Sequence, residues 1–344
     1  MQPDLKANER ALVRHQLLSA SAVIRQLAYR QDLATDPVLE LAQRLIFDID
    51  ARKTERPFRG LGELLIRCLD DIQVTPEGEI PRFKVPTGYV DLDRLLGGFR
   101  PADLIAVAGW KHAGKTSFVL NLAVNAAAKG GASIAIFSPQ LSAEALSSRA
   151  FRMEAGLDQA REASDQLSEN ELRRVSYALN LFNSVSIWID DTECIAIADL
   201  CANARSLASE ETLDLIIVED VDHIRIDDRS WLRSEGTDLD SVTRTLKALA
   251  GELRIPVVVV ARPSGESKHP RSRAPRLTDL PEPLEQHANV VLVLHRRELS
   301  DPHSDNRGVA DILVLKNHDG PQGSIPLLFQ ERTSKFLDLE VFRA

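Results

Sequence analysis

Residues 109–116 read GWKHAGKT and match the phosphate-binding loop pattern G-x-x-x-x-G-K-[ST] at every position. The apolar run Leu104–Ala108 before the loop predicts a buried strand, and the apolar spacing over Ser117–Lys129 predicts a helix after it. A strand, a glycine-rich turn and a helix N-terminus form an anion site, because backbone N–H groups and the helix dipole both favour phosphate oxygens there. A chance match in a glycine-containing loop is the alternative, and the strand–loop–helix context disfavours it.

The loop pattern assigns roles to individual side chains. We expect ATP to bind at Gly109, Gly114, Lys115, Thr116 and Ser117. Lys115 would reach the β- and γ-phosphates, and the Thr116 hydroxyl would hold Mg²⁺. ATP and Mg²⁺ are therefore the expected cofactors.

Composition indicates a globular protein that is not basic over its whole surface. The chain has 344 residues, of which 44% are hydrophobic and 27% charged, and its formal net charge is −9. A local basic groove for nucleic acid remains compatible with that charge. The three cysteines lack CxxC spacing, which disfavours a zinc site and favours a reducing compartment. Without a signal-peptide pattern or a run long enough to span a membrane, we expect a cytoplasmic protein with no membrane partner.

The hydrophobic pattern changes along the chain and predicts three regions. Residues 1–56 have apolar positions at helical spacing with one polar break, which predicts a helical hairpin. Residues 57–85 contain a third amphipathic helix over about 61–72 and then a linker with proline, glycine and acid. Residues 86–344 alternate short apolar runs with helical segments, which is typical of an α/β nucleotide-binding core.

In the third region apolar strands are separated by helices, which predicts a mostly parallel sheet covered on both faces. The expected strands are Leu104–Ala108, Ile134–Ser138, Val185–Ile189, Leu215–Val218, Val257–Ala261, Val290–Leu294, Ile312–Leu315 and Ile325–Phe329.

Many short stretches in this region occur in the same order as in one known family. They lie at residues 86–93 (PTGYVDLD), 95–99 (LLGGF), 109–116, 136–140 (IFSPQ), 187–191 (IWIDD), 215–219 (LIIVE), 246–250 (LKALA), 256–260 (PVVVV), 308–311 (GVAD) and 319–323 (DGPQG). With these stretches the sequence resembles bacterial replicative helicases of the DnaB family. The resemblance implies a RecA-like P-loop NTPase core with a twisted sheet, working as a hexameric ring around single-stranded DNA with nucleotide between neighbouring subunits.

The first 85 residues also resemble part of that family. The hairpin of residues 1–56 is similar to the end of the family's N-terminal domain, and the helix over 61–72 is similar to the linker helix that docks on the neighbouring subunit. The globular head that normally precedes the hairpin is expected to be absent, which disfavours primase binding. An unrelated helical cap on a RecA-like core is the alternative.

ATP hydrolysis by this architecture needs a phosphate cradle, a magnesium ligand, a group that activates water and an arginine from the next subunit. The family's magnesium-associated acid, normally aspartate, aligns with Glu219, for which an ordinary strand-end acid is the alternative. Its water-activating glutamate aligns with Gln140, whose amide can orient water but cannot accept a proton. Asp220 or Glu144 could supply the missing carboxylate.

Two cationic positions also depart from the family. The glutamine that senses the γ-phosphate aligns with Arg262, which fits phosphate binding and a structural ion pair equally well. The family's trans-acting arginine lies in a Lys-x-Arg-x-Gly-Pro stretch, which here keeps Lys316 and has His318, shorter and mostly neutral at pH 7. Lys316 could cover part of the lost charge, and Arg296 and Arg297 are further candidates.

The DNA-facing loop of the family corresponds to residues 279–286 (DLPEPLEQ), which lack its arginine and glycine and contain two prolines. Proline has no backbone N–H, so amide contacts to phosphate are lost as well. Four basic residues lie just upstream within nine positions and could bind DNA phosphates, with a solvated loop as the alternative. They are Lys268, Arg271, Arg273 and Arg276.

Three functional hypotheses follow. The departures at Gln140, at His318 and in the loop of Pro281 and Pro283 all weaken function, so we favour an ATP-binding, ring-forming relative with impaired hydrolysis. A fully active 5′-to-3′ helicase is the first alternative, supported by the intact phosphate loop. A RecA-type regulatory ATPase that binds protein rather than DNA is the second. The expected partners are single-stranded DNA and further copies of this chain, or a complete DnaB relative in a mixed ring.

Overall fold

The computed structural model describes Ser21, Ile24, Arg25, Leu61 and residues 84–160, 167–226, 239–264, 273–299 and 307–339. The chain divides into two compact units, Met1–Val74 and Thr75–Ala344. In the first unit the four described residues are helical, and the remainder of the predicted hairpin and linker helix lies outside the described residues. Within the described part of the chain, no helix is long and apolar enough to cross a membrane.

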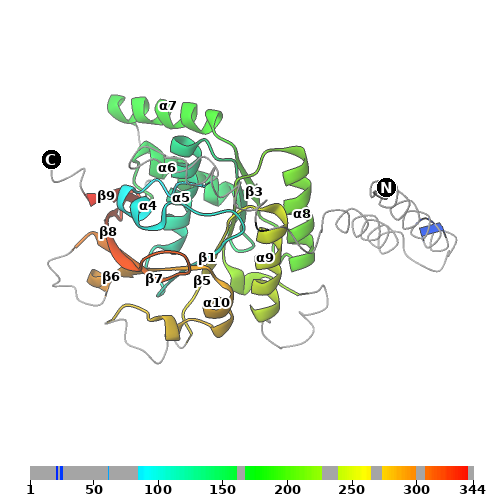
Figure 1. Ribbon diagram of the computed structural model, residues 1–344. Coiled ribbons are helices and arrows are strands. Elements are labelled where there is room, and N and C mark those ends of the chain that lie inside the picture. Colours follow the sequence, from blue (N-terminus) through cyan, green and yellow to red (C-terminus); the bar gives the residue numbers. More distant parts are fainter. Residues whose placement is uncertain are drawn as a thin grey trace. The chain divides into compact units, whose positions relative to one another are not determined.

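The second unit is built on a nine-stranded sheet with the order β3-β2-β4-β5-β1-β6-β7-β8-β9 (Figure 1). The strands are β1 (Leu104–Gly109), β2 (Ile134–Phe137), β3 (Ile187–Asp190), β4 (Leu215–Val218), β5 (Val257–Ala261), β6 (Val290–Arg296), β7 (Val309–Asn317), β8 (Gly323–Gln330) and β9 (Lys335–Asp338). All pairs from β3 to β6 are parallel, and the three pairs from β6 to β9 are antiparallel.

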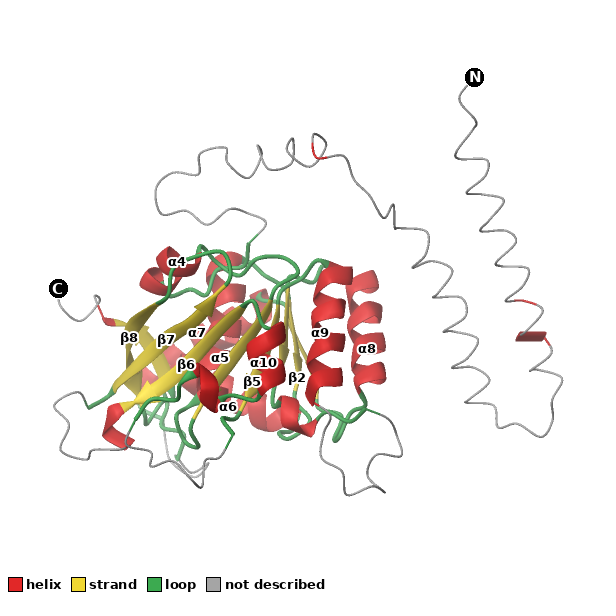
Figure 2. Ribbon diagram, turned by 60° about the horizontal axis from the view of Figure 1, so that its bottom comes forward, coloured by secondary structure: helices red, strands yellow, loops and turns green. Residues whose placement is uncertain are grey.

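Helices cover both faces of the sheet (Figure 2). They are α4 (Val90–Leu96), α5 (Lys115–Gly130), α6 (Ala143–Ala155), α7 (Glu169–Ser184), α8 (Ile197–Glu210), α9 (Leu239–Leu253) and α10 (Glu282–His287). Successive residues of β1 point to opposite faces. Ile105 and Val107 belong to a core with side chains of α4, α5 and α6, whereas Leu104 and Ala106 belong to a core with α8, α9 and α10.

The expected α/β architecture is confirmed, with changes at the ends of elements. All eight expected strands form, although β3 begins at Ile187 rather than Val185, β2 ends at Phe137 rather than Ser138, and β6 continues to Arg296. β9 was not predicted, and neither was the antiparallel pairing of the last three strands. β9 has four residues, Lys-Phe-Leu-Asp, and only Phe336 among them is buried, so it lacks the apolar run by which the other strands were found.

The strand that was missed supports the phosphate loop. The Phe336 ring lies 5.5 Å from the Phe118 ring of α5, and a Cβ added to Gly114 would lie 3.5 Å from Phe336 Cζ. The buried Asn121 side chain of α5 donates to the Ser334 carbonyl at 3.0 Å and accepts from the Phe336 N–H at 3.1 Å. β9 is therefore fastened to the helix that begins in the loop.

Replacing Asn121 with leucine should destabilise the protein, because the Phe336 N–H and the Ser334 carbonyl would lose their partner in a buried place. We expect Asn121→Leu to lower the free energy of unfolding by roughly 2–4 kcal/mol, the cost of one or two unsatisfied buried groups. Urea denaturation followed by circular dichroism measures this. The exposed Asn203, which donates to Asp190 at 2.8 Å, provides the control. Asn203→Leu should change the value by less than about 1 kcal/mol, and equal losses in both variants would contradict the role of Asn121.

Candidate nucleotide-binding site

The carboxyl ends of the parallel strands gather four of the predicted catalytic residues at one edge of the sheet, namely Gln140, Glu219, Asp220 and Arg262. Val218 of β4 pairs with Phe137 of β2 and with Val259 of β5, and Val260 pairs with Val107 of β1. The segments that follow these strands therefore lie side by side. In open α/β sheets this edge is where ligands bind.

The phosphate loop occupies the centre of that edge. Gly109 allows the close approach of β6, since an added Cβ would lie 3.0 Å from the Leu294 carbonyl oxygen. Gly114 has a left-handed φ of 96° and caps α5, a conformation that glycine adopts without steric cost. Lys115 Nζ donates to the carbonyls of Gly109 at 2.8 Å and Trp110 at 3.4 Å. The loop thus has the strand–turn–helix form that the sequence predicted, with its lysine folded over it.

Glu219 directly follows β4, and its side chain is buried. The Thr116 hydroxyl hydrogen-bonds the Glu219 carboxylate. Burial raises the pKa of Glu219 and the nearby Asp220 raises it further, whereas the Thr116 hydrogen bond and the charges of Arg149 and Lys115 act in the opposite direction. Glu219 Oε2 is buried and has no hydrogen-bond partner among the described residues.

This orphaned oxygen beside a hydroxyl fits Mg²⁺. Magnesium is usually held by one or two protein oxygens, with the nucleotide phosphates and water supplying the others. Thr116 and Glu219 would be the two protein ligands, as the sequence predicted. No cluster of three or more histidine, cysteine or acidic side chains able to hold a metal occurs in the described part of the chain, so the phosphates would be needed to complete the shell.

Gln140 lies at the same edge, in the turn between β2 and α6. The Glu219 N–H donates to the Phe137 carbonyl at 2.8 Å, which places the end of β2 beside Glu219. Ser138 closes the turn through hydrogen bonds to both backbone groups of Leu141. The Gln140 side chain is exposed, and so is Glu144, in the first turn of α6.

Asp220 and Arg262 form an ion pair across the ends of β4 and β5. Arg262 Nε donates to Asp220 Oδ2 at 2.9 Å, and the Asp222 N–H donates to the other carboxylate oxygen at 3.2 Å. Asp220 is buried, whereas 46% of the Arg262 side chain is exposed. Of the two interpretations of Arg262, the ion pair is therefore formed, and phosphate binding by the exposed part of the guanidinium stays a prediction.

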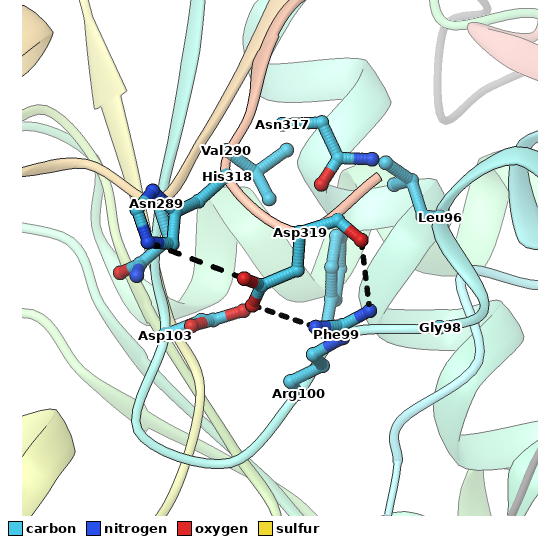
Figure 3. A pocket seen from close by; sticks show the side chains of 10 residues that line it. All are labelled: Leu96, Gly98, Phe99, Arg100, Asp103, Asn289, Val290, Asn317, His318 and Asp319. Atoms are coloured by element: carbon cyan, nitrogen blue, oxygen red, sulfur yellow. Dashed lines mark hydrogen bonds and ion pairs between the residues drawn. The ribbon is translucent and has the colours of Figure 1, made fainter. Parts of the chain in front are cut away.

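Lys316 and His318 lie at the opposite end of the sheet from the phosphate loop. On β6, Val290 pairs with Asn317, whereas Leu294, four residues further along, pairs with Gly109. Four residues of strand span about 13 Å. His318 is exposed at the tip of the β7–β8 hairpin (Figure 3), and it cannot reach the nucleotide of its own chain.

Arg296 and Arg297, named as substitutes for the trans-acting arginine, do not lie near His318. The antiparallel register places Arg296 beside Ala310, at the other end of β6. Arg296 is buried, donates to Glu298 at 2.8 Å and lies over the Phe329 ring at 4.4 Å. Its contact with the His112 carbonyl, at 3.5 Å, makes it a support of its own phosphate loop.

The predicted DNA-binding segment is described only in part. Lys268 and Arg271 lie outside the described residues. Arg273 makes a two-pronged ion pair with Asp279 at 2.6 and 3.0 Å, and Arg276 is exposed. Pro281 and Pro283 lie at the start of α10, where backbone N–H groups have no partner within the helix, so the N–H groups that proline lacks are not needed there.

Two residues that contact the candidate site were not among those predicted. Trp110, at a variable position of the loop, donates its indole N–H to the Arg273 carbonyl at 2.9 Å and so joins the phosphate loop to the basic segment. Arg149 of α6 acts electrostatically on Glu219. An aromatic residue inside the loop was a visible signal for the first, whereas the second depends on how α6 packs.

Residues 84–338 match the family model of the DnaB-like helicase C terminal domain. The chain is also 31% identical over 336 residues to the replicative DNA helicase DnaB of Geobacillus stearothermophilus, covering 96% of this chain and 73% of that protein. The chain belongs to the DnaB-like helicase family. The replicative DNA helicase DnaC of Bacillus subtilis (strain 168) is 29% identical, with the same coverage.

Solved structures share the fold. A structure of an isolated ATPase domain superposes with a TM-score of 0.74 at 22% identity, covering 82% of this chain and 99% of that domain. A DnaB-like replicative helicase, studied with its interactions with primase, gives a TM-score of 0.78 at 20% identity, covering 94% of this chain and 76% of that one. The predicted resemblance and the RecA-like core are thereby confirmed.

Removing the loop lysine should abolish nucleotide binding by this DnaB-like chain. Lys115→Ala takes away the ammonium that would bind the β- and γ-phosphates, and we expect the Kd for ATP to rise at least about 100-fold. Isothermal titration calorimetry measures this, with the exposed Lys111 of the same loop as the control. Retained affinity in Lys115→Ala would refute the assignment of the phosphate loop.

The ionised carboxylate of Glu219 should lower the free energy of unfolding while providing a ligand for Mg²⁺. Its pKa is higher in the folded protein than in the unfolded chain. The free energy of unfolding therefore falls as the pH rises from the pKa of the unfolded chain to that of the folded protein, and it stays low above the latter. Below the pKa of the unfolded chain the carboxyl is neutral in both states and has no such effect. We expect Glu219→Gln to raise the free energy of unfolding at pH 7 by on the order of 1 kcal/mol, with a smaller gain at pH 5. The variant should also lose the Mg²⁺ dependence of ATP affinity.

Thermal unfolding at the two pH values and ATP titrations with and without Mg²⁺ measure both effects. The control is Glu169→Gln on α7, whose exposed carboxylate pairs with Arg173 and should contribute under about 1 kcal/mol. If Glu219→Gln is less stable than the parent at pH 7, the carboxylate is not a cost to the fold.

Proposed function

We propose that this DnaB-family chain is a cytoplasmic protein of DNA replication that binds ATP and Mg²⁺, assembles into a ring around single-stranded DNA and hydrolyses ATP slowly. The binding half of the proposal is supported by the complete phosphate loop and by the contact between Thr116 and Glu219. Gly109, Gly114 and Lys115 would surround the phosphates, and Thr116 and Glu219 would hold the metal.

The position of Gln140 carries the proposal of slow hydrolysis. It lies at the edge that holds Lys115 and Glu219, at the position where the family has a carboxylate. General-base catalysis contributes about 10²–10⁴ in rate, so an amide in its place should reduce turnover by a similar factor. Asp220 is a poor substitute because its carboxylate already accepts hydrogen bonds from Arg262 and from the Asp222 N–H.

Ring assembly is supported by the distance between the two halves of the proposed machinery. The hairpin of Lys316 and His318 is separated from its own phosphate loop along β6. A residue of that hairpin could serve only a nucleotide held by another subunit, either a second copy of this chain or a complete DnaB relative in a mixed ring. Six subunits is the number that the family resemblance implies.

Contact with single-stranded DNA is the least supported part of the proposal. Arg276 is exposed, but Arg273 is bound to Asp279. The hydrogen bond from Trp110 to the Arg273 carbonyl provides a route by which a nucleotide in the loop would affect the basic segment. Binding should weaken steeply as salt concentration rises, as expected of phosphate contacts.

Single-turnover ATP hydrolysis, with and without single-stranded DNA, alongside an ATP-binding titration, tests the proposal. Tight binding with little hydrolysis supports it. Turnover that DNA stimulates would instead identify an active helicase, which the intact loop favours. Binding that is tight but unaffected by DNA at any salt concentration would favour a regulatory ATPase.

Restoring the family's residues should restore hydrolysis. We expect Gln140→Glu together with His318→Arg to raise the single-turnover rate by at least about 10²-fold, the lower limit for a regained general base. The matched control is Gln159→Glu, because Gln159 lies beyond α6, where its side chain binds the Arg149 and Thr333 carbonyls. An unchanged rate in the double variant would mean that the missing parts lie elsewhere.

A further inference from the structure

The tip of the β7–β8 hairpin holds a charged residue that comes from another part of the chain. Arg100 lies in the turn between α4 and β1. Its Nη1 donates to Asp319 Oδ2 at 2.6 Å and its Nη2 to the Asp319 carbonyl at 3.5 Å. Arg100, His318 and Asp319 line the same small pocket, together with Asp103 and Asn289 (Figure 3). The Asp319 carboxylate thus lies between this guanidinium and the imidazole of His318, whose Nε2 lies 4.0 Å from Asp319 Oδ1, and His318 occupies the position of the family's trans-acting arginine.

The environment of Arg100 leaves its charge available. Its side chain is 36% exposed and that of Asp319 is 49% exposed. Ion pairs this exposed contribute little to stability, so the guanidinium can exchange Asp319 for a ligand that carries more negative charge. A polyphosphate is such a ligand, and the planar fork of arginine binds it bidentately.

The two lysines near this end of the sheet are engaged differently. Lys316 Nζ donates to the Glu285 carbonyl at 2.6 Å, in the last turn of α10, where the helix dipole favours a cation. Lys247 Nζ donates to the Ala102 carbonyl at 2.7 Å and to Asn289 Oδ1 at 2.6 Å. Both ammonium groups are directed to neutral acceptors of the fold, whereas Arg100 is directed to the exposed hairpin tip.

We propose that Arg100 is the trans-acting cation of this chain, which gives up its pairing with Asp319 to contact the phosphates of a nucleotide bound at the phosphate loop of a neighbouring subunit. The inference rests on the proposed function, since it requires nucleotide between subunits. It assigns to Arg100 the permanent charge of a guanidinium, a group that position 318 does not have. Because Gln140 provides no base, the contact strengthens binding across the interface more than it accelerates hydrolysis.

The release rate of a fluorescent ATP analogue from the assembled protein tests this assignment. We expect Arg100→Gln to release the analogue on the order of 10- to 100-fold faster, as for the loss of one charge-assisted contact. Asp319→Asn should release it at the parent rate or more slowly, because Arg100 keeps its charge and loses a competitor. If Arg100 served only as the partner of Asp319, both variants would behave alike, and that result would overturn the proposal.

A matched control and a folding check accompany these variants. Arg94 of α4 is also an arginine on the surface, paired with Asp91 at 2.9 Å, and Arg94→Gln should leave the release rate unchanged. Arg100→Lys keeps the charge without the planar fork and should give an intermediate rate. Circular dichroism of each variant establishes that it is folded, and Asp319→Asn provides the contrast even where Arg100→Gln is less stable.

Mixed assemblies show whether Arg100 acts between subunits. Lys115→Ala subunits lack nucleotide binding but carry Arg100, so adding them to Arg100→Gln subunits should slow release from the latter. Release that stays fast in the mixture would overturn action in trans. If the parent protein binds no analogue, or binds it equally well as a monomer, the proposed function fails and the assignment with it. If the parent binds tightly only when assembled and Arg100→Gln matches it, the assignment of Arg100 alone fails.

Discussion

The buried carboxylate of Glu219 is the constraint on which the rest of the site depends. β4 ends between β2 and β5, and Glu219, the residue that follows it, is only 5% exposed. One favourable contact comes from the Thr116 hydroxyl at the start of α5, and the charges of Arg149 and Lys115 offset part of the cost of burial. These contacts leave Glu219 Oε2 without a hydrogen-bond partner among the described residues. A divalent cation would satisfy the remaining oxygen and at the same time anchor the phosphates that the loop is shaped to hold.

The sheet also separates the residues that can contact a nucleotide of their own chain from those that could contact only a nucleotide of a neighbouring subunit. The parallel strands deliver Lys115, Glu219 and Gln140 to one edge, and the antiparallel return through β7 delivers His318 to the other. Arg296 and Arg100 illustrate the division. Arg296 reaches its own phosphate loop from the end of β6, and Arg100 joins the far hairpin through Asp319. The register of β6 places the first beside its own phosphate loop, and the pair with Asp319 places the second at the opposite end of the sheet, where its proposed action is on another subunit.

What the sequence could predict follows from how far apart in the chain the interacting residues are. The phosphate loop is one contiguous stretch with its strand and helix attached, and the eight expected strands are apolar runs, of which β1, β2, β4 and β5 are fully buried. β9 is a short strand with a single buried side chain, and its role depends on Asn121, which is 215 residues from Phe336. The pair of Arg100 and Asp319 spans 219 residues, and no local pattern marks either partner. The resemblance located the position of the lost arginine, but only the fold shows which guanidinium lies beside it.

The combination of a missing base and a displaced cation has a specific energetic consequence. An interaction that is equally strong with bound ATP and with the transition state increases affinity without increasing the rate of the chemical step. If Gln140 leaves the site without a group that takes the proton from water, as we propose, a guanidinium on the phosphates would provide this uniform kind of binding. A nucleotide that contacts two subunits stabilises their association by about RT ln(1 + [L]/Kd), where [L] is the concentration of free nucleotide and Kd its dissociation constant from the assembled pair. In the proposed assembly ATP therefore acts as a ligand that joins neighbouring subunits, and the departures at Gln140 and His318 describe one change of use, from turnover to cohesion, rather than two separate losses.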